Sequence, residues 1–142
     1  MKPSLIYSSP KKRTLQTAQI IADICNIGDV YESNLLLEYD KGEWSSMPSS
    51  ELQKTISKKG GWVSGRPAFD WHPPRGESWQ DLQLRAKRVI NNLKEAHQDT
   101  DVIVVVSHNQ FIRAIRGVAL DLSFNLWFDY KPTNAEVLEI DI

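Results

Sequence analysis

Residues 102–109 read VIVVVSHN, five consecutive apolar residues followed by Ser107, His108 and Asn109. An apolar run of this length is typical of a strand that is buried on both faces, as in a parallel sheet covered by helices. A helix is expected directly afterwards, over residues 111–120. In open α/β sheets, ligands bind beyond the carboxyl ends of the strands. His108 is therefore a candidate functional residue, and the alternative is a histidine that satisfies a backbone group at the edge of the core.

A second helix is predicted just before this strand. Ser78 followed by Asp81 resembles a capping box, the side-chain pattern that starts a helix. The apolar residues that follow are spaced three or four apart and mark one buried face, which fades near His97: Leu82, Ala86, Val89, Ile90 and Leu93.

The N-terminal part repeats the alternation of strand and helix. Residues 4–8 read as a short strand, with Ser9 as the N-cap and Pro10 as the first position of a helix. The apolar face of that helix is Leu15, Ala18, Ile21, Ala22 and Cys25. Strands are also expected over residues 30–38 and 135–142. The pattern predicts one α/β domain over residues 1–142, a three-layer α/β/α arrangement with a mainly parallel sheet.

Residues 39–77 differ from the rest of the chain. They contain four of the seven prolines and five of the seven glycines, so most of this stretch is expected to be loop, with a short helix near residues 49–58. A long loop that carries aromatic residues in a small domain is typical of a lid or a binding loop.

Composition excludes several function classes. Lys and Arg number 17 against 18 Asp and Glu, which argues against bulk binding of nucleic acid or a membrane surface. No apolar run approaches the roughly 20 residues of a membrane span, and the N-terminus lacks the apolar core of a signal peptide. The single Cys25 can form neither an internal disulfide nor, alone, a thiolate metal site. These features predict a cytoplasmic protein.

Two further segments are candidates for chemistry. Lys11, Lys12 and Arg13 lie in the predicted first turn of a helix, where the dipole disfavours cations by roughly 0.3–1 kcal/mol each. A bound anion such as phosphate would account for them, and the alternative is a solvated basic turn. Glu38 follows the predicted strand 30–38 and could donate a proton if burial raised its pKa. Here the alternative is a surface glutamate. His72 and His97 are interpreted as structural or solvated.

Together these segments resemble the histidine phosphatase superfamily, the phosphoglycerate mutase-like proteins. Residues 8–18 (SSPKKRTLQTA) resemble the family's SPLKRAxQTA segment, and residues 36–44 (LLEYDKGEW) its L-x-E-x-x-x-G-x-W segment. Gly76-Glu77-Ser78 with Asp81 and Arg85 is similar to its GES-x-x-D-x-x-x-R helix start, and residues 104–108 (VVVSH) to its VVSHG strand end. Among family members, the small bacterial phosphatases of the alpha-ribazole phosphatase type are the most similar.

The resemblance implies a role for each candidate. Arg13 would clamp a phosphoryl group, His108 would hydrogen-bond its oxygens, and Glu38 would be the general acid. Asn109 stands where the family has glycine, and its side chain would crowd or bind the phosphate. The ligand would be a small phosphorylated molecule. The resemblance implies no cofactor, and no cluster of residues has metal-ligand spacing.

One element of the family is absent from the 142 residues. Its nucleophile is a histidine in an Arg-His-Gly motif at the end of a first strand, but the histidines here occur as Trp-His-Pro, Ala-His-Gln and Ser-His-Asn. Relative to the family the chain is expected to be N-terminally truncated, with that strand missing and an edge of strand 102–106 unpaired, which favours a homodimer or strand exchange.

Two functions remain open at this point. The first is a phosphatase- or mutase-type domain whose catalysis through phosphohistidine is in doubt. The second is a non-catalytic phosphate-binding module, either a pseudoenzyme or a gene fragment. The aromatic loop over residues 62–71, with Arg66 and Arg75, would select the phosphorylated molecule.

Overall fold

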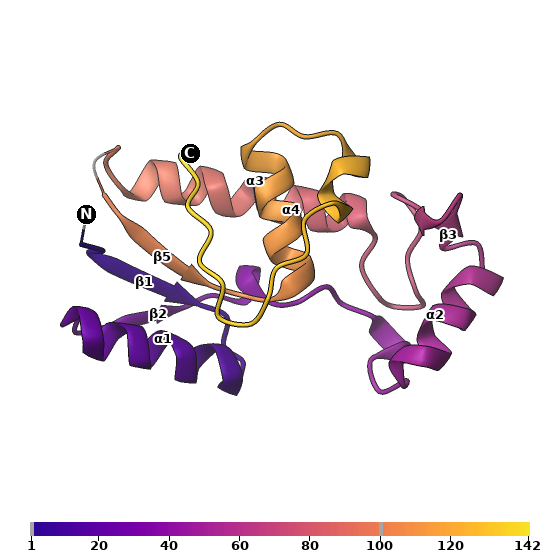
Figure 1. Ribbon diagram of the computed structural model, residues 1–142, viewed down its shortest axis with the longest axis horizontal. Coiled ribbons are helices and arrows are strands. Elements are labelled where there is room, and N and C mark those ends of the chain that lie inside the picture. Colours follow the sequence, from indigo (N-terminus) through magenta and orange to yellow (C-terminus); the bar gives the residue numbers. More distant parts are fainter. Residues whose placement is uncertain (1, 100) are drawn as a thin grey trace.

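A parallel sheet organises the computed structural model, which describes residues 2–99 and 101–142 (Figure 1). Its strand order is β2 (Val30–Glu32), β1 (Leu5–Ser8) and β5 (Ile103–Val106), and both pairings are parallel. Leu5 lies opposite Ile103, and Ser8 lies opposite Val106. Strands β1 and β5 therefore end level with each other, at the same edge of the sheet.

Helices cover both faces of this sheet, so the predicted three-layer α/β/α arrangement is confirmed (Figure 1). On one face Ile6 packs with Ala18 and Ala22 of α1 (Lys12–Cys25). The other face meets a larger cluster built from α3 (Trp79–Ala96), α4 (Asn109–Ala119) and the 3-10 helix η3 (Phe124–Phe128). Strand residues alternate between the two clusters: Ile6, Val104 and Val106 face α1, whereas Tyr7, Ile103 and Val105 face α3 and α4.

The helices follow their sequence patterns, with one shift of boundary. The predicted apolar face of α3 is buried, and Ser78 with Asp81 forms the capping box. Helix α1 begins at Lys12 after Lys11 as the N-cap, and the prediction of Ser9 as N-cap was wrong. Ser9 still belongs to the strand end, because its N–H donates to Val106 O at 3.0 Å. Cys25 lies half-buried on the expected face of α1.

The predicted strand over residues 30–38 is much shorter than expected. Strand β2 ends at Glu32, and Ser33 then caps the 3-10 helix η1 (Asn34–Leu36), its side chain accepting from the N–H of Leu35. The leucines at 35–37 turn into the core beside α3, where Leu36 is fully buried, so their apolar character reflects core packing and not a strand. Glu38 therefore follows a helical turn and not a strand.

The predicted final strand over residues 135–142 was also wrong. Ala135 has a left-handed φ of 58°, and the carboxylate of Glu136 accepts from the N–H and hydroxyl of Thr133, which closes a turn. Beyond that turn Val137 is 91% exposed. Alternation of apolar and polar residues favours a strand only where a neighbouring strand supplies the ladder, and no described strand pairs with this segment.

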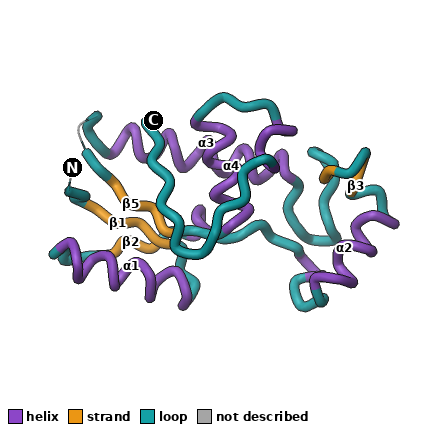
Figure 2. Tube along the Cα trace, viewed as in Figure 1, coloured by secondary structure: helices purple, strands orange, loops and turns teal. Residues whose placement is uncertain are grey.

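Residues 39–77 form the excursion at the right of the molecule, and Figure 2 shows that much of it is loop. It contains η2 (Gly42–Trp44) and α2 (Ser49–Lys58), the latter as predicted. A short hairpin of β3 (Trp62–Val63) and β4 (Arg66–Pro67) was not predicted. Its turn residues Ser64 and Gly65 both have positive φ, which matches the twist of a hairpin.

Strand β5 is an edge strand within the described residues. It pairs with β1, and no described strand lies on its other side, so its residues are only half-buried despite their apolar character. Homodimer formation through this edge stays a prediction. Within residues 2–99 and 101–142, no helix combines the length and the apolar character that a membrane crossing requires.

The contact between α4 and η3 can be tested at Gly117. A Cβ at this position would meet the indole of Trp127, which is 1% exposed. We expect Gly117→Ala to destabilise the fold by about 1–3 kcal/mol, although alanine is the better helix former by about 1 kcal/mol. The measurement is urea unfolding followed by circular dichroism. Gly28→Ala is the control, because open space surrounds Gly28, and a change within about 0.5 kcal/mol is expected there. Equal stability of the two variants would contradict the described packing.

Candidate functional site

His108 lies where the sequence places it, between the end of β5 and the start of α4, as the N-cap residue of that helix. Its side chain is held at both ring nitrogens. Arg13 Nη2 is 2.7 Å from Nδ1, and Ser9 Oγ is 2.8 Å from Nε2. Because a guanidinium can only donate, Nδ1 accepts, and the neutral ring therefore carries its proton on Nε2 and donates to Ser9.

The surroundings of His108 keep the imidazole uncharged. The residue is 5% exposed, and burial is the main cause that lowers its pKa from 6.5 to about 4. The positive charges of Arg13, Lys11 and Arg85 lower the pKa further, in that order. At neutral pH the ring is a polar group with one donor and one acceptor, and the site's positive charge comes from its basic side chains.

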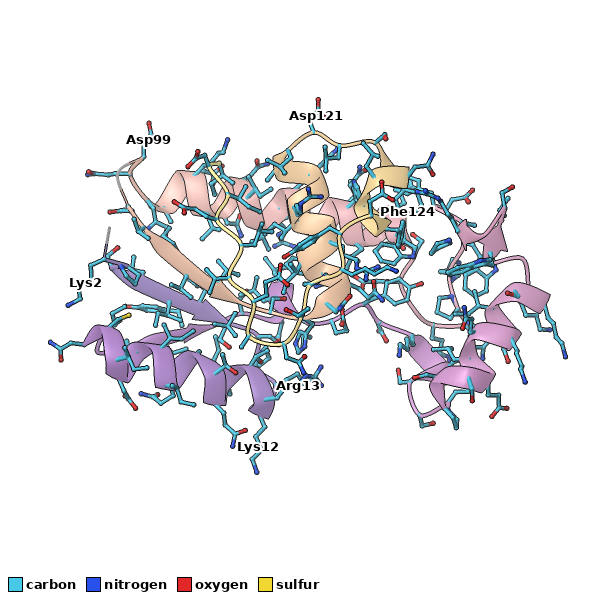
Figure 3. The ribbon with its side chains drawn as sticks, viewed as in Figure 1. Lys2, Lys12, Arg13, Asp99, Asp121 and Phe124 are labelled. Atoms are coloured by element: carbon cyan, nitrogen blue, oxygen red, sulfur yellow. The ribbon has the colours of Figure 1, made fainter. Side chains whose placement is uncertain are left out.

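Arg13 comes from the first turn of α1, which contains no acidic residue. Figure 3 shows it at the end of α1 that lies beside the strand ends, with Lys12 directed away from the molecule. The contact with His108 occupies one of the five N–H donors of the guanidinium. Arg13 is exposed, and no ion pair with a described carboxylate involves it. Its remaining donors face solvent and can receive an anion.

Glu38 reaches the same helix terminus from η1. Its Oε1 accepts from the N–H of Gln110 at 3.1 Å and of Phe111 at 3.3 Å, and also from the N–H of Tyr39 at 2.9 Å. The N-terminal turn of a helix favours a negative charge at this place. The structure thus brings the predicted Arg13, His108 and Glu38 to one edge of the sheet.

Asn109 is the fourth predicted residue, and it is exposed at the first position of α4. Its side-chain amide donates to Pro132 O at 3.3 Å, so in this structure it contacts the C-terminal segment. His72 and His97 have structural partners, as interpreted from the sequence. His72 Nδ1 lies 3.0 Å from Pro73 O, and His97 Nε2 lies 3.0 Å from the hydroxyl of Tyr7.

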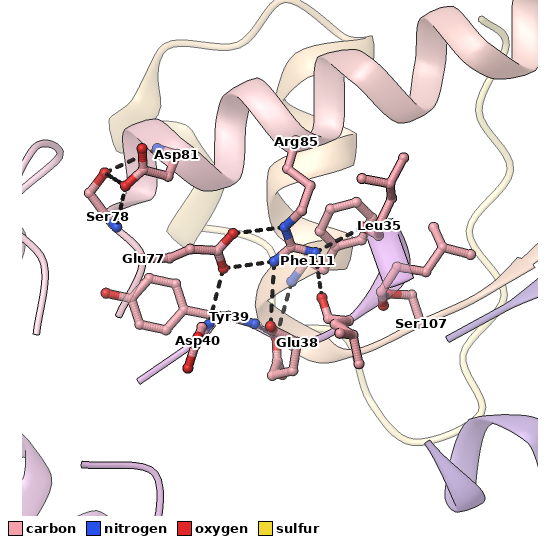
Figure 4. Close-up of polar contacts among 12 residues, drawn as sticks. Leu35, Glu38, Tyr39, Asp40, Glu77, Ser78, Asp81, Arg85, Ser107 and Phe111 are labelled. Atoms are coloured by element: carbon pink, nitrogen blue, oxygen red, sulfur yellow. Dashed lines mark hydrogen bonds and ion pairs between the residues drawn. The ribbon is translucent and has the colours of Figure 1, made fainter. Parts of the chain in front are cut away.

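Two parts of the site were not found from the sequence. Ser9 was assigned to helix capping but is fully buried against His108. Arg85 and Glu77 were noted only within a motif. They form a bidentate ion pair, with Nε and Nη2 of Arg85 each 2.8 Å from an oxygen of Glu77 (Figure 4). Strand pairing is the signal that could have indicated Ser9, because the end of β1 must lie beside the end of β5.

The aromatic loop makes contacts within its own part of the molecule and with η3, where Phe69 packs on Phe124 with ring centroids 4.8 Å apart. Trp71 packs on Trp44 with ring centroids 5.7 Å apart and donates to Lys59 O. Arg75 pairs with Glu43, and Arg66 pairs with Asp129 and donates to Asn125 O. An open depression of the surface lies in this region, lined by residues that include Asp70, Trp71 and His72. Selection of a ligand by this loop stays a prediction.

The fold and the site define an α/β protein with arginine, histidine and glutamate gathered where its parallel strands end. The model of the histidine phosphatase superfamily (branch 1) matches residues 1–142, and the chain belongs to this superfamily.

Curated relatives include a phosphoserine phosphatase and a phosphoglycerate mutase. The chain is 30% identical over 132 residues to phosphoserine phosphatase 1 of Hydrogenobacter thermophilus, covering 92% of this chain and 61% of the relative. It is 31% identical over 136 residues to the 2,3-bisphosphoglycerate-dependent phosphoglycerate mutase of Thermoplasma acidophilum, covering 96% and 62%. The chain therefore spans about three fifths of the length of these relatives.

Solved structures share the fold at lower sequence identity. An alpha-ribazole phosphatase from Shigella flexneri matches with a TM-score of 0.70 and 19% identity, over 90% of this chain and 60% of that one. A mycobacterial glucosyl-3-phosphoglycerate phosphatase matches with a TM-score of 0.73 and 23% identity, over 89% and 62%. These likenesses show the fold.

The contact between Arg13 and His108 gives a test by titration. We expect Arg13→Ala to raise the pKa of His108 from about 4 towards 6.5, because the variant removes a neighbouring positive charge and the donor to Nδ1. The measurement is NMR of the imidazole signals against pH. Lys12→Ala is the control, because it deletes an adjacent cation that does not contribute to the shift. If both variants leave the His108 titration unchanged, the described contact is wrong.

Proposed function

We propose that this domain binds a small phosphate ester at the edge of the sheet formed by Arg13, His108 and Glu38, and carries out chemistry of the phosphatase or mutase type on it. The observation that carries the proposal is the contact of Arg13 with His108 beside the N-terminus of α4. A guanidinium is the side chain best suited to hold phosphate oxygens. A helix N-terminus adds backbone donors and a favourable dipole.

Each side chain has a role in this proposal. Arg13 clamps the phosphoryl group with the donors it does not use on His108. The imidazole of His108, kept neutral, turns its Nε2–H from Ser9 to a phosphate oxygen. In its protonated form Glu38 donates a proton to the leaving oxygen, while an attacking group, water or a histidine, forms the new bond to phosphorus. The N–H donors to Oε1 favour the ionised form, so Glu38 takes up this proton before the step. Its second oxygen Oε2 makes only a long contact of 3.4 Å with the N–H of Gln110 and is therefore the one available for this transfer.

The printed names of the relatives support a small ligand. Phosphoserine phosphatase 1, the phosphoglycerate mutase and the alpha-ribazole phosphatase are named for small phosphorylated molecules. We extend to this chain only what these names share, a phosphate group on a small molecule.

A second candidate function is supported by one specific observation. The 142 residues contain no Arg-His-Gly, the motif that carries the nucleophile in the family this chain resembles. With the phosphate-binding groups but without that histidine, the domain would bind a phosphate ester and not turn it over. A covalent intermediate divides one difficult step into two easier ones, and loss of the nucleophile of an unrelated protease lowers turnover by about 10⁶.

Phosphate binding is tested by titration calorimetry with inorganic phosphate. We expect Arg13→Ala to weaken binding about tenfold or more, because a charge-assisted hydrogen bond contributes about 1.5–3 kcal/mol. Lys12→Ala removes the same charge from a side chain directed away from the sheet and should have a smaller effect. No phosphate binding by the unsubstituted chain, or equal weakening by both variants, would contradict the proposed site.

Turnover is tested separately with p-nitrophenyl phosphate. Three proteins are compared: the chain as given, its His108→Ala variant, and the chain extended upstream by a strand that ends in Arg-His-Gly. If only the extended protein hydrolyses the ester, the 142 residues contain the phosphate site without its attacking group. If the chain as given is active, the second candidate function is excluded, and loss of this activity in His108→Ala would show that it depends on the site around His108.

A further inference from the structure

All three nitrogens of the Arg85 guanidinium form hydrogen bonds, to the backbone that leads into Glu38 and to the carboxylate of Glu77. Nη1 donates to Leu35 O at 2.8 Å and to Leu37 O at 2.7 Å, and Nη2 lies 3.4 Å from Glu38 O. Nε and Nη2 hold the carboxylate of Glu77. Figure 4 shows Arg85 reaching from α3 to the backbone that leads into Glu38. The ion pair is largely buried, with side-chain exposures of 15% for Arg85 and 20% for Glu77.

The bound carbonyls belong to a segment that has left the sheet. Strand β2 ends at Glu32 and η1 ends at Leu36, so residues 35–38 have no ladder to join. Side chains supply the missing donors: Arg85 for Leu35 and Leu37, and Ser107 Oγ for Leu36 at 2.8 Å. The path of the main chain into Glu38 is thus set by α3 and by the loop before α4.

Glu77 binds the backbone that follows Glu38. Its Oε2 accepts from the N–H of Asp40 at 3.0 Å, and its own N–H donates to Asp40 O at 2.9 Å. The pair of Arg85 and Glu77 therefore holds the chain both before and after Glu38. Burial, with the carboxylates of Glu77, Asp81 and Asp40, also raises the pKa of the Tyr39 hydroxyl, so this intervening residue stays neutral.

The same guanidinium also contacts the helix that receives Glu38. It lies over the ring of Phe111, 4.7 Å from the centroid, and the N–H of Phe111 donates to Glu38 Oε1. One side chain thereby fixes the distance between the backbone of Glu38 and the first turn of α4, where the carboxylate is bound.

We propose that Arg85, oriented by Glu77, is the positioning residue that places the Glu38 carboxylate at the N-terminus of α4. A proton donor must be held within about 0.5 Å of its productive place, and a planar fork with five donors can bind two carbonyls and a carboxylate at once. Lysine has three donors on a flexible stem and cannot reproduce these contacts. The inference rests on the proposed function in one respect, the role of Glu38 as proton donor.

The test uses the amide signals of Gln110 and Phe111 in the ¹⁵N-labelled chain of 142 residues. Their N–H groups donate to Glu38, so both signals report the protonation of its carboxyl group when pH is lowered. Glu38→Gln provides the reference without this titration. Protonation of His108, the N-cap of α4, also shifts these amides near pH 4, so the contribution of Glu38 is the difference from Glu38→Gln. We expect Arg85→Met to lose this contribution and Arg85→Lys to retain only part of it. The contact of Arg13 with His108, read from the imidazole signals, should persist.

Arg88→Met is the matched control, because it removes an exposed arginine one turn along α3 and should leave the two amides unchanged. If Arg85→Met does not fold, Glu77→Gln serves in its place, since it keeps the shape and removes the charge that orients Arg85; the same loss is expected. A folded Arg85→Met or Glu77→Gln with the unsubstituted titration overturns the proposal.

This readout is independent of phosphate. Absence of phosphate binding in the unsubstituted chain would overturn the proposed function, whereas the amide titration would still decide whether Arg85 positions Glu38. Conversely, Arg85→Met should weaken the binding of inorganic phosphate less than Arg13→Ala does, because the contact of Arg13 with His108 is kept and only the more distant charge of Arg85 is lost. A loss as large as that of Arg13→Ala would mean that Arg85 acts on the phosphate site itself and not through Glu38.

Discussion

The parallel register between β1 and β5 is the constraint on which the site depends. Ser8 lies opposite Val106, and the N–H of Ser9 continues the ladder to Val106 O. Ser9 is therefore beside the loop that carries His108, although 99 residues separate the two in the chain. The helix that follows each strand starts at this edge, which places Arg13 at the beginning of α1 and the first turn of α4 together. A shift of one residue would reverse the faces of every strand side chain and separate these groups.

Burial and charge then give each group a different character. His108 is enclosed and surrounded by cations, so its pKa is low and it serves as a neutral hydrogen-bonding group. Arg13 remains exposed, and its charge is not neutralised by any described carboxylate. The carboxylate of Glu38, at this helix terminus, is bound by backbone N–H groups. An incoming anion thus meets the unpaired positive charge of Arg13 and the imidazole of His108, which Arg13 and Ser9 already hold in place.

The sequence predicted those parts that depend on local pattern. The apolar run at residues 102–106 and the periodicity of residues 82–93 correspond to β5 and α3, and the motif residues Arg13, Glu38 and His108 were identified as candidates. What failed depends on tertiary partners. Residues 34–38 are apolar because η1 packs into the core, and residues 135–142 alternate without a strand beside them. The role of Ser9 could not be inferred without the pairing of β1 with β5, nor that of Arg85 without knowing that residues 35–38 leave the sheet.

The excursion over residues 39–77 bears on where an anionic ligand can be bound. Its two arginines form exposed ion pairs, Arg75 with Glu43 and Arg66 with Asp129. Its tryptophans Trp44 and Trp71 pack on each other. No ion pair with a described carboxylate involves Lys11, Lys12 or Arg13 at the first turn of α1, and the same holds for the lysines of the excursion, Lys41, Lys54, Lys58 and Lys59. What distinguishes the first turn of α1 is its place beside His108 and the N-terminus of α4, where we propose that the phosphate is held. The ion pairs of Arg66 and Arg75 are exposed, and each guanidinium keeps further donors, so these two arginines can still contact an anionic ligand.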